Sequence, residues 1–198
     1  MKQRDIFFRG FYKAPRGVKA DSSNTLMYPR INVYGISLRG PVGSGLGNIE
    51  TGYYHSPDDS DGTNRLIENS SFKTMAGYEK DLGNDLSMGC QYLIEQMIHF
   101  NEFKISMGNS NLMRDELRQL ATIRLTKRMY KQTLLLSCFV FYSPTDEDAY
   151  IRPSMDYDLN DHVSISLGGN IMWGIDDYTE FGQMKRNDNA YTRIRYSF

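Results

Sequence analysis

The sequence has few cysteines, no long apolar run and no excess of charge of either sign. Its 198 residues include two cysteines, Cys90 and Cys138, whose spacing matches neither a metal site nor a redox motif. No apolar run approaches the roughly 18 residues of a membrane-spanning helix, which excludes helical spans but not membrane-crossing strands. Basic and acidic residues nearly balance, 23 against 24, so the composition gives no reason to expect a nucleic-acid partner.

Aromatic residues are plentiful instead. They make up 13% of the chain, and 14 residues are tyrosines, which favour β-strands and membrane interfaces. Many of the aromatic residues fall near the ends of the expected strands, among them Tyr53, Tyr54, Tyr142, Tyr150 and Trp173. This placement indicates two aromatic girdles, with the strand preference of tyrosine as the alternative explanation.

Apolar and polar residues alternate in about ten segments of roughly ten residues each. Alternation with a period of two is typical of strands that have one apolar and one polar face. The expected strands are 5–14, 31–40, 46–55, 71–80, 86–97, 116–127, 133–143, 149–158, 162–173 and 189–198. One segment, 111–130, fits two patterns: Met113, Leu117, Leu120 and Ala121 also have helical spacing, but the alternation favours a strand.

The last segment ends the chain on an aromatic residue. Ala190, Thr192, Ile194, Tyr196 and Phe198 share one face of this strand, and Arg193 and Arg195 lie on the other. The segment resembles the C-terminal strand of Gram-negative outer-membrane β-barrels, in which a terminal Phe after alternating apolar residues is the assembly signal. The resemblance assigns that role to Tyr196 and Phe198. The alternative is the last strand of a soluble sandwich.

Connection lengths also alternate along the chain. Short turns are expected at Pro41–Gly45, Asp81–Asp85, Arg128–Gln132 and Asn160–Asp161, while most of the other connections run to about 15 residues. The connection near Pro144–Asp148 is the exception, because it is short. Short turns at one end and long loops at the other are typical of outer-membrane barrels. We therefore predict an all-β fold, an antiparallel up-and-down transmembrane β-barrel, or part of one, of about ten strands in a single domain spanning 1–198.

The polar faces of these strands carry the candidate pore-lining residues. The basic ones are Arg9, Arg39, Arg118, Arg124, Arg152, Arg193 and Arg195, and the acidic ones are Glu50, Glu79, Glu95 and Asp156. Because the basic residues outnumber the acidic ones, their side chains would bias a pore toward anions. Alternatively, pairs of opposite charge would fill a narrow lumen. A ten-strand barrel favours the filled lumen, and a larger barrel favours the pore.

Several stretches resemble uncharacterised porin-like outer-membrane proteins of deltaproteobacteria. The motifs are 139–153 (FVFYSPTDEDAYIRP), 167–170 (LGGN), 181–183 (FGQ) and the closing 196–198 (YSF), with 28–30 (YPR) and 52–54 (GYY) upstream. The resemblance implies passive diffusion of small hydrophilic solutes through the outer membrane. It also implies that this chain corresponds to the C-terminal part of longer proteins. The start, Met1-Lys2-Gln3-Arg4-Asp5, has no signal-peptide core, so export would require either processing or a longer chain.

An enzyme is the alternative from a different class. His55 beside Asp58 and Asp59 could belong to a hydrolase at the barrel rim, with Asp176 or Asp177 as the second acid, but no catalytic motif accompanies them. The loop of Asp59, Asp61, Gly62 and Glu68 partly matches a calcium loop, although Pro57 occupies its first ligand position. We therefore expect no enzyme activity, no metal site and no cofactor.

The expected location is the outer membrane of a Gram-negative bacterium. The expected partners are outer-membrane lipid, lipopolysaccharide and the barrel-assembly machinery. A closed small barrel with a structural or adhesive role at the surface remains the alternative function. The sequence specifies neither the solute nor the oligomeric state.

Overall fold

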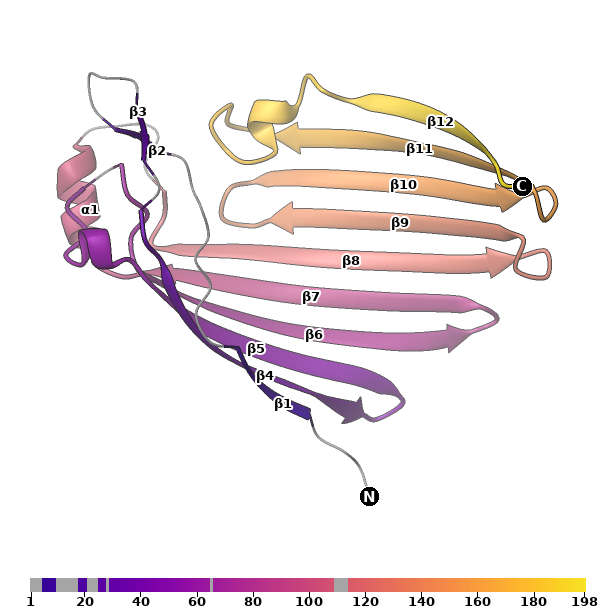
Figure 1. The fold of residues 1–198 in the computed structure, drawn as a ribbon, viewed down its shortest axis with the longest axis horizontal. Coiled ribbons are helices and arrows are strands. Elements are labelled where there is room, and N and C mark those ends of the chain that lie inside the picture. The colour runs from indigo at the N-terminus through magenta and orange to yellow at the C-terminus, as the bar shows by residue number, and fades with distance from the viewer. Residues whose placement is uncertain (1–4, 10–17, 21–24, 28, 65, 109–113) are drawn as a thin grey trace. The chain divides into compact units, whose positions relative to one another are not determined.

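A computed structural model describes residues 5–9, 18–20, 25–27, 29–64, 66–108 and 114–198. The main sheet has ten strands, which pair in the order in which they occur in the chain (Figure 1). They are β1 (Asp5–Arg9), β4 (Asn32–Val42), β5 (Gly45–His55), β6 (Ser71–Gly83), β7 (Leu86–Met97), β8 (Leu117–Met129), β9 (Leu134–Ser143), β10 (Asp148–Asp158), β11 (Val163–Gly174) and β12 (Asn189–Tyr196). The predicted all-β, antiparallel, up-and-down sheet is thus confirmed.

The remaining elements are short. β2 (Val18–Ala20) and β3 (Thr25–Met27) form a separate hairpin between β1 and β4. The connections also hold η1 (Pro57–Asp59), α1 (Phe100–Met107) and η2 (Gly182–Met184). No described helix is long and apolar enough to cross a membrane.

The strand prediction was accurate to within a few residues from β4 onward. The ambiguous segment 111–130 contains strand β8, while 109–113 lie outside the described residues. Helix α1 was missed, because its eight residues lie in a segment that was expected to be loop. The first strand was expected over 5–14; β1 covers Asp5–Arg9, and 10–14 lie outside the described residues.

The sheet is not closed into the predicted barrel. Its order begins at β1 and ends at β12, and within the described residues no pairing joins these two strands. Both are therefore edge strands, each with a row of backbone N–H and C=O groups that faces no described neighbour.

The turn between β6 and β7 shows how the sequence sets a short connection. Gly83, Asn84 and Asp85 all have positive φ, at 86°, 52° and 57°. Gly, Asn and Asp are the residues that adopt this conformation most readily, and such turns match the twist of the strands they join. The Asp81 carboxylate also accepts the Gly83 N–H at 2.8 Å, which stabilises the turn.

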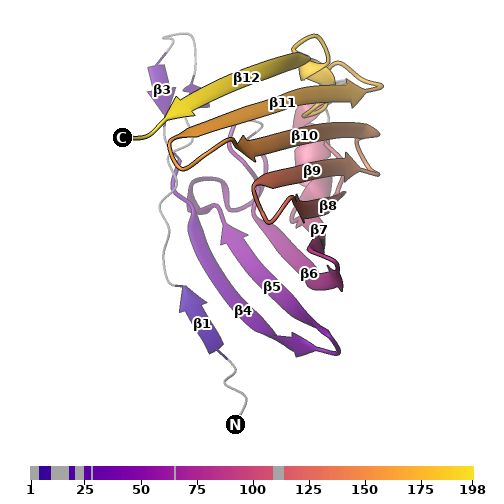
Figure 2. The same ribbon diagram turned by 90° about the vertical axis from the view of Figure 1, so that its right-hand side faces the viewer.

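Contacts divide the chain into two compact units. One takes in Met1–Gly40, Asn48–Ala76 and Leu93–Arg118, and the other takes in Pro41–Gly47, Gly77–Tyr92 and Gln119–Phe198. In the second unit β9, β10, β11 and β12 lie side by side in both ribbon views (Figures 1 and 2).

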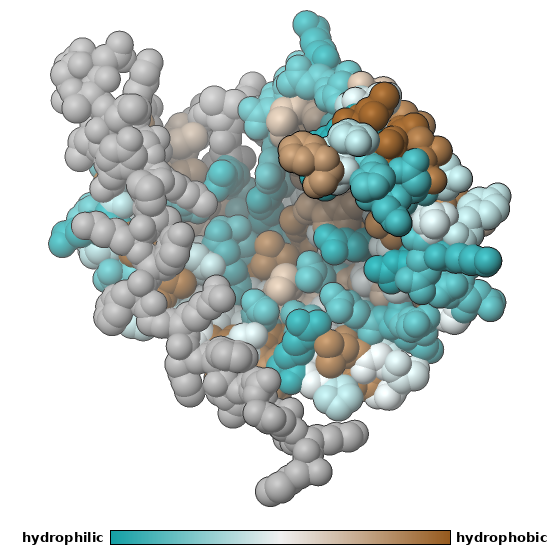
Figure 3. Space-filling model, turned by 45° about the vertical axis from the view of Figure 1, so that its right-hand side comes forward, coloured by the Kyte–Doolittle hydropathy of each residue, from teal (hydrophilic) through white to brown (hydrophobic). Residues whose placement is uncertain are grey.

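Few hydrophobic side chains are buried. Among the described residues, Phe103 and Phe181 are the hydrophobic side chains that the fold removes from its surface, while many Ile, Leu and Tyr side chains are exposed. Hydrophobic residues accordingly lie open at the surface beside hydrophilic ones (Figure 3). A soluble domain depends on apolar burial for its stability. This chain, as described, leaves most of that surface uncovered.

Candidate functional site

The strands β8–β12 carry a largely apolar face, which Lys127 on β8 and Thr192 on β12 interrupt at its edges. Strand register places Ile123, Val140, Ile151 and Ile171 in one row across β8–β11. A parallel row across β9–β11 consists of Leu136, Met155 and Leu167. We call these two rows, with the half-buried free thiol Cys138 between them, the apolar face. Five of these side chains are exposed: Ile123, Leu136, Ile151, Leu167 and Ile171.

Aromatic residues flank the apolar face at both ends. Trp173 on β11 and Tyr142 on β9 lie toward the loop end, and Tyr157 on β10 and Tyr196 on β12 lie toward the turn end; all four are exposed. Tyr196 pairs with Val163, ten residues from Trp173 along β11. Ten residues extend about 34 Å along a strand. At a tilt of about 45° this spans about 24 Å, close to the apolar band of about 25 Å in membrane barrels.

The opposite side of β8–β12 is polar, and we call it the polar face. One row contains Arg128, Leu135, Asp156, Ser166 and Arg193 in register. Within it, the Ser166 hydroxyl donates to the Asp156 carboxylate at 2.5 Å. A second row pairs Arg124 with Phe139 and Phe139 with Arg152.

The aromatic rings on the polar face are packed against neighbours. The Arg124 guanidinium lies 4.9 Å from the centre of the Phe139 ring, a cation–π contact. The Tyr191 ring covers Gly168, where an added Cβ would lie 2.4 Å from ring atoms, so a larger residue there would displace the ring.

The β11–β12 connection folds against this polar side. Phe181 is buried with its ring centroid 5.8 Å from that of Phe141 and 5.6 Å from that of Tyr150. Its backbone N–H donates at 2.8 Å to Asp148, whose side chain is fully buried. The other carboxylate oxygen of Asp148 has no hydrogen-bond partner among the described residues. Gly174 and Gly182 touch so closely that a Cβ on Gly174 would lie 2.5 Å from Gly182.

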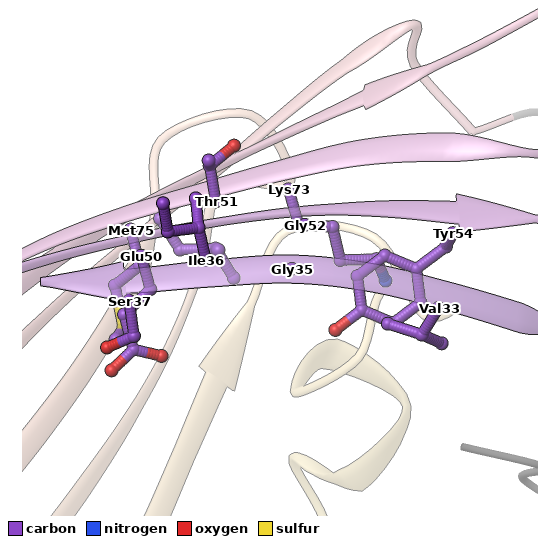
Figure 4. A pocket seen from close by; sticks show the side chains of 11 residues that line it. Val33, Gly35, Ile36, Ser37, Glu50, Thr51, Gly52, Tyr54, Lys73 and Met75 are labelled. Carbon is purple, nitrogen blue, oxygen red and sulfur yellow. The ribbon is translucent and has the colours of Figure 1, made fainter. Parts of the chain in front are cut away.

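The first unit contains a groove of about 590 Å³ on β4, β5 and β6. Thr51 bonds Thr74 at 3.0 Å and Tyr53 stacks on Phe72 at 4.9 Å, so residue 52 lies opposite 73 and residue 50 opposite 75. Ser37, Glu50, Tyr54, Lys73 and Met75 line the groove. Ser37 and Glu50 point to the same side of the sheet and Thr51 to the other (Figure 4).

Lys73 is held in place inside this groove. Its ammonium lies 2.9 Å from Glu95 and 4.0 Å from Glu68, and 4.8 Å from the centre of the Tyr54 ring. The side chains of Lys73, Glu68 and Glu95 are each less than a quarter exposed. Two glycines, Gly35 and Gly52, lie side by side; the Tyr54 ring packs over Gly52, and Gly35 leaves part of the groove floor without a side chain.

Three of the four acidic residues among the predicted pore-lining residues lie on neighbouring strands. The acidic Glu50, Glu79 and Glu95 lie on β5, β6 and β7, whereas Arg118 and Arg124 lie on β8. Arg152 and Asp156 lie on β10, and Arg193 and Arg195 on β12. Arg39 lies on β4, and Arg9 lies on β1, where the structure describes the backbone alone.

The two residues of the predicted assembly signal lie at the end of the chain. Tyr196 is the last residue of β12, and Phe198 follows the strand with its side chain fully exposed. His162 and Ser197 bond each other across β11 and β12, since the Ser197 N–H donates to the His162 carbonyl at 2.8 Å.

The acids and the histidine of the rim-hydrolase alternative each have other partners within their own unit. Asp58 accepts hydrogen bonds from the Arg30 guanidinium at 2.7 and 2.9 Å, which lower the pKa of Asp58. Asp59 is buried and accepts the N–H groups of Thr63 and Asn64. Among the described residues, His55 instead contacts Tyr53 and Ser70, each at 3.4 Å.

The remaining acids of that hypothesis are occupied as well. Asp177 is paired with Lys185, which lowers the pKa of Asp177, and Asp176 accepts the Tyr178 hydroxyl at 3.1 Å. No group of three His, Cys, Asp or Glu side chains that could hold a metal ion occurs in the described part of the chain.

Sequence reasoning placed two aromatic residues wrongly. Tyr54 and Tyr150 were assigned to the girdles, but Tyr54 lines the groove and Tyr150 donates to Asn170 at 2.5 Å on the polar side. Strict alternation from Tyr53 and Ile151 would have shown this, because neighbours on a strand point to opposite sides. Phe181 had no local signal, since its burial depends on contacts with residues 31 or more positions away.

Comparison with known proteins gives no relative: the sequence matches no family model and no curated protein.

Proposed function

We propose that this chain forms a membrane-embedded β-barrel, or part of one, in the outer membrane of a Gram-negative bacterium, where it allows passive diffusion of small hydrophilic solutes. The observation that carries the proposal is the exposed apolar face of β8–β12, with aromatic residues at both ends and a width of about 24 Å after tilt. In water this surface would favour aggregation. In a bilayer the apolar face exchanges its contact with water for contact with lipid chains.

Two further features support the membrane setting. A membrane sheet must satisfy its edge groups by pairing, so β1 and β12 would bond each other or further strands once embedded. Most of the described connections alternate between short turns, as at 43–44 and 84–85, and long loops, as at 56–70 and 175–188. This segregation is typical of outer-membrane barrels.

The polar face supports movement of water-soluble solutes. Arg128, Arg193 and Arg195 outnumber Asp156 and Asp158 in the two adjoining rows of β8–β12, so this part of the chain favours anions.

The test is conductance across a planar lipid bilayer containing the purified chain. We expect ion conductance with a reversal potential that indicates anion preference. This preference should decrease when Arg193 and Arg195 are changed to Gln. Absence of conductance, or a cation preference that survives both substitutions, would contradict the anion pore.

A filled interior is the second candidate, and the packing around Phe181 favours it. Phe141, Tyr150 and Phe181 occupy the loop end of the polar side with stacked or tilted rings. If such packing extends along the whole interior, the protein is a structural or adhesive surface protein. It would then insert into bilayers stably without conducting.

A further inference from the structure

The groove on β4–β6 has the features of a binding site rather than a packing defect. A Cβ on Gly35 would meet its nearest atom, the Thr51 carbonyl oxygen, at 3.4 Å, and Gly52 Cα at 3.8 Å. These are ordinary contacts, so packing does not require glycine at this position. Glycine in a strand interior lowers stability and often marks a bulge, a bend, or a place where a ligand or another backbone approaches closely.

Two groups of opposite charge line this floor. Glu50 and Lys73 are diagonal neighbours on β5 and β6, because residue 50 lies opposite 75. Diagonal neighbours in an antiparallel pair have Cα atoms about 7–8 Å apart. Both side chains line the same groove.

The two charges differ in how they are held. Lys73 is fixed by Glu95, Glu68 and the Tyr54 ring. Glu50 is exposed, and within the described residues it makes no ion pair or hydrogen bond. A cation that two carboxylates hold in place and an available carboxylate thus line one groove, together with the bare backbone of Gly35 and the Tyr54 ring.

We infer that this groove binds a small zwitterion, an amino acid or a short peptide, with its ammonium group on Glu50 and its carboxylate near Lys73. The Ser37 hydroxyl, which points the same way as Glu50, supplies a further hydrogen bond (Figure 4). A singly charged cation would pair with Glu50 alone. A neutral sugar would leave Glu50 without an ionic partner, whereas Lys73 keeps Glu95 and Glu68. The inference rests on the proposed function, because it names a class of hydrophilic solute that the first unit would bind.

The experiment measures equilibrium binding to the full chain folded in detergent micelles, by calorimetry. The probes are γ-aminobutyrate, butyrate and butylamine, which share a four-carbon chain and differ by one charged group each. γ-Aminobutyrate is expected to bind about tenfold or more tightly than either singly charged analogue, since each charged hydrogen bond contributes about 1.5–3 kcal/mol.

Three variants locate the site. Glu50→Gln should reduce γ-aminobutyrate binding to the level of butyrate. Gly35→Val keeps every charge, suits a strand and fills the floor, so it should abolish binding. Glu79→Gln removes a carboxylate on β6 outside the groove and should leave binding unchanged.

Equal binding of all three probes, preference for butylamine, tighter binding of a neutral sugar, or binding that survives Gly35→Val would overturn the inference. Measuring the conductance of the same preparation distinguishes failure of the binding site from failure of the proposed pore. Binding without conductance would reject the pore and keep the site, and conductance without binding would reject the site alone.

Discussion

Placing a charge at the centre of the apolar face tests whether that face meets lipid. Leu167 is the most suitable position, because it lies near the middle of β11, six residues from Trp173 and four from Val163, and its side chain is 40% exposed. Replacing Leu167 with Arg costs about 2–4 kcal/mol if the side chain faces the middle of a bilayer. If the side chain faces water instead, an exposed substitution changes the free energy of unfolding by less than about 0.5 kcal/mol.

The control is Ser154→Arg. Ser154 pairs with Gly168, so it lies at the same depth as Leu167 but on the polar face. An arginine there adds the same charge and bulk without entering lipid. The expected difference between the two variants is about 2–4 kcal/mol, which is about 30- to 700-fold in the folding equilibrium constant.

The assay is reversible unfolding by guanidinium in lipid vesicles, followed by the fluorescence of the single tryptophan, Trp173. The linear dependence of the unfolding free energy on denaturant then gives the change in unfolding free energy that each substitution causes. Equal stability of Leu167→Arg and Ser154→Arg, or a native, monomeric Leu167→Arg protein in water without lipid, would refute a lipid-facing role for this face.

Three further predictions follow from the loops. Phe181→Ala should release the β11–β12 connection, at a cost of up to about 3–5 kcal/mol, and make 175–188 more sensitive to protease; unchanged cleavage would contradict the packing on Phe141. Acidification should loosen the contact between Arg30 and Asp58. The pKa of Asp58 is lowered in the folded chain, so the stabilisation is complete above its unfolded value of about 3.9 and is lost as the pH falls through the folded value; a pH-independent chemical shift of the Arg30 Nε–H from pH 6 to 2 would contradict it. In intact cells, external protease should cut within 56–70 or 174–188 and spare 81–85, whereas cutting at 81–85 alone would reverse the topology.

The strands could be predicted from the sequence because their signals are local. Within 163–173, apolar residues alternate with the small or polar Ser164, Ser166, Gly168 and Asn170, and β11 covers Val163–Gly174. The turn at Gly83, Asn84 and Asp85 contains the residue types that positive φ requires. Pairing in chain order then follows, because hairpin connections bring consecutive strands together.

The features that sequence reasoning missed depend on distant contacts or on weak signals. The burial of Phe181 requires Phe141 and Tyr150, which lie on other strands. The groove results from two glycines on neighbouring strands, Gly35 and Gly52, and neither strand alone indicates it. Helix α1 had a weak local signal in Phe100 and Phe103, three residues apart, but eight residues are too few for a clear helical period.

The most direct test of the account uses the natural fluorescence of Trp173. This tryptophan is exposed at the loop end of the apolar face, so in a membrane its ring would lie near the lipid headgroups. We would reconstitute the chain in vesicles whose lipids carry bromine at a shallow or a deep position of the acyl chain. We predict strong quenching by the shallow bromine, weaker quenching by the deep one, and little quenching by aqueous iodide. Strong quenching by iodide together with none by either brominated lipid would contradict the membrane setting.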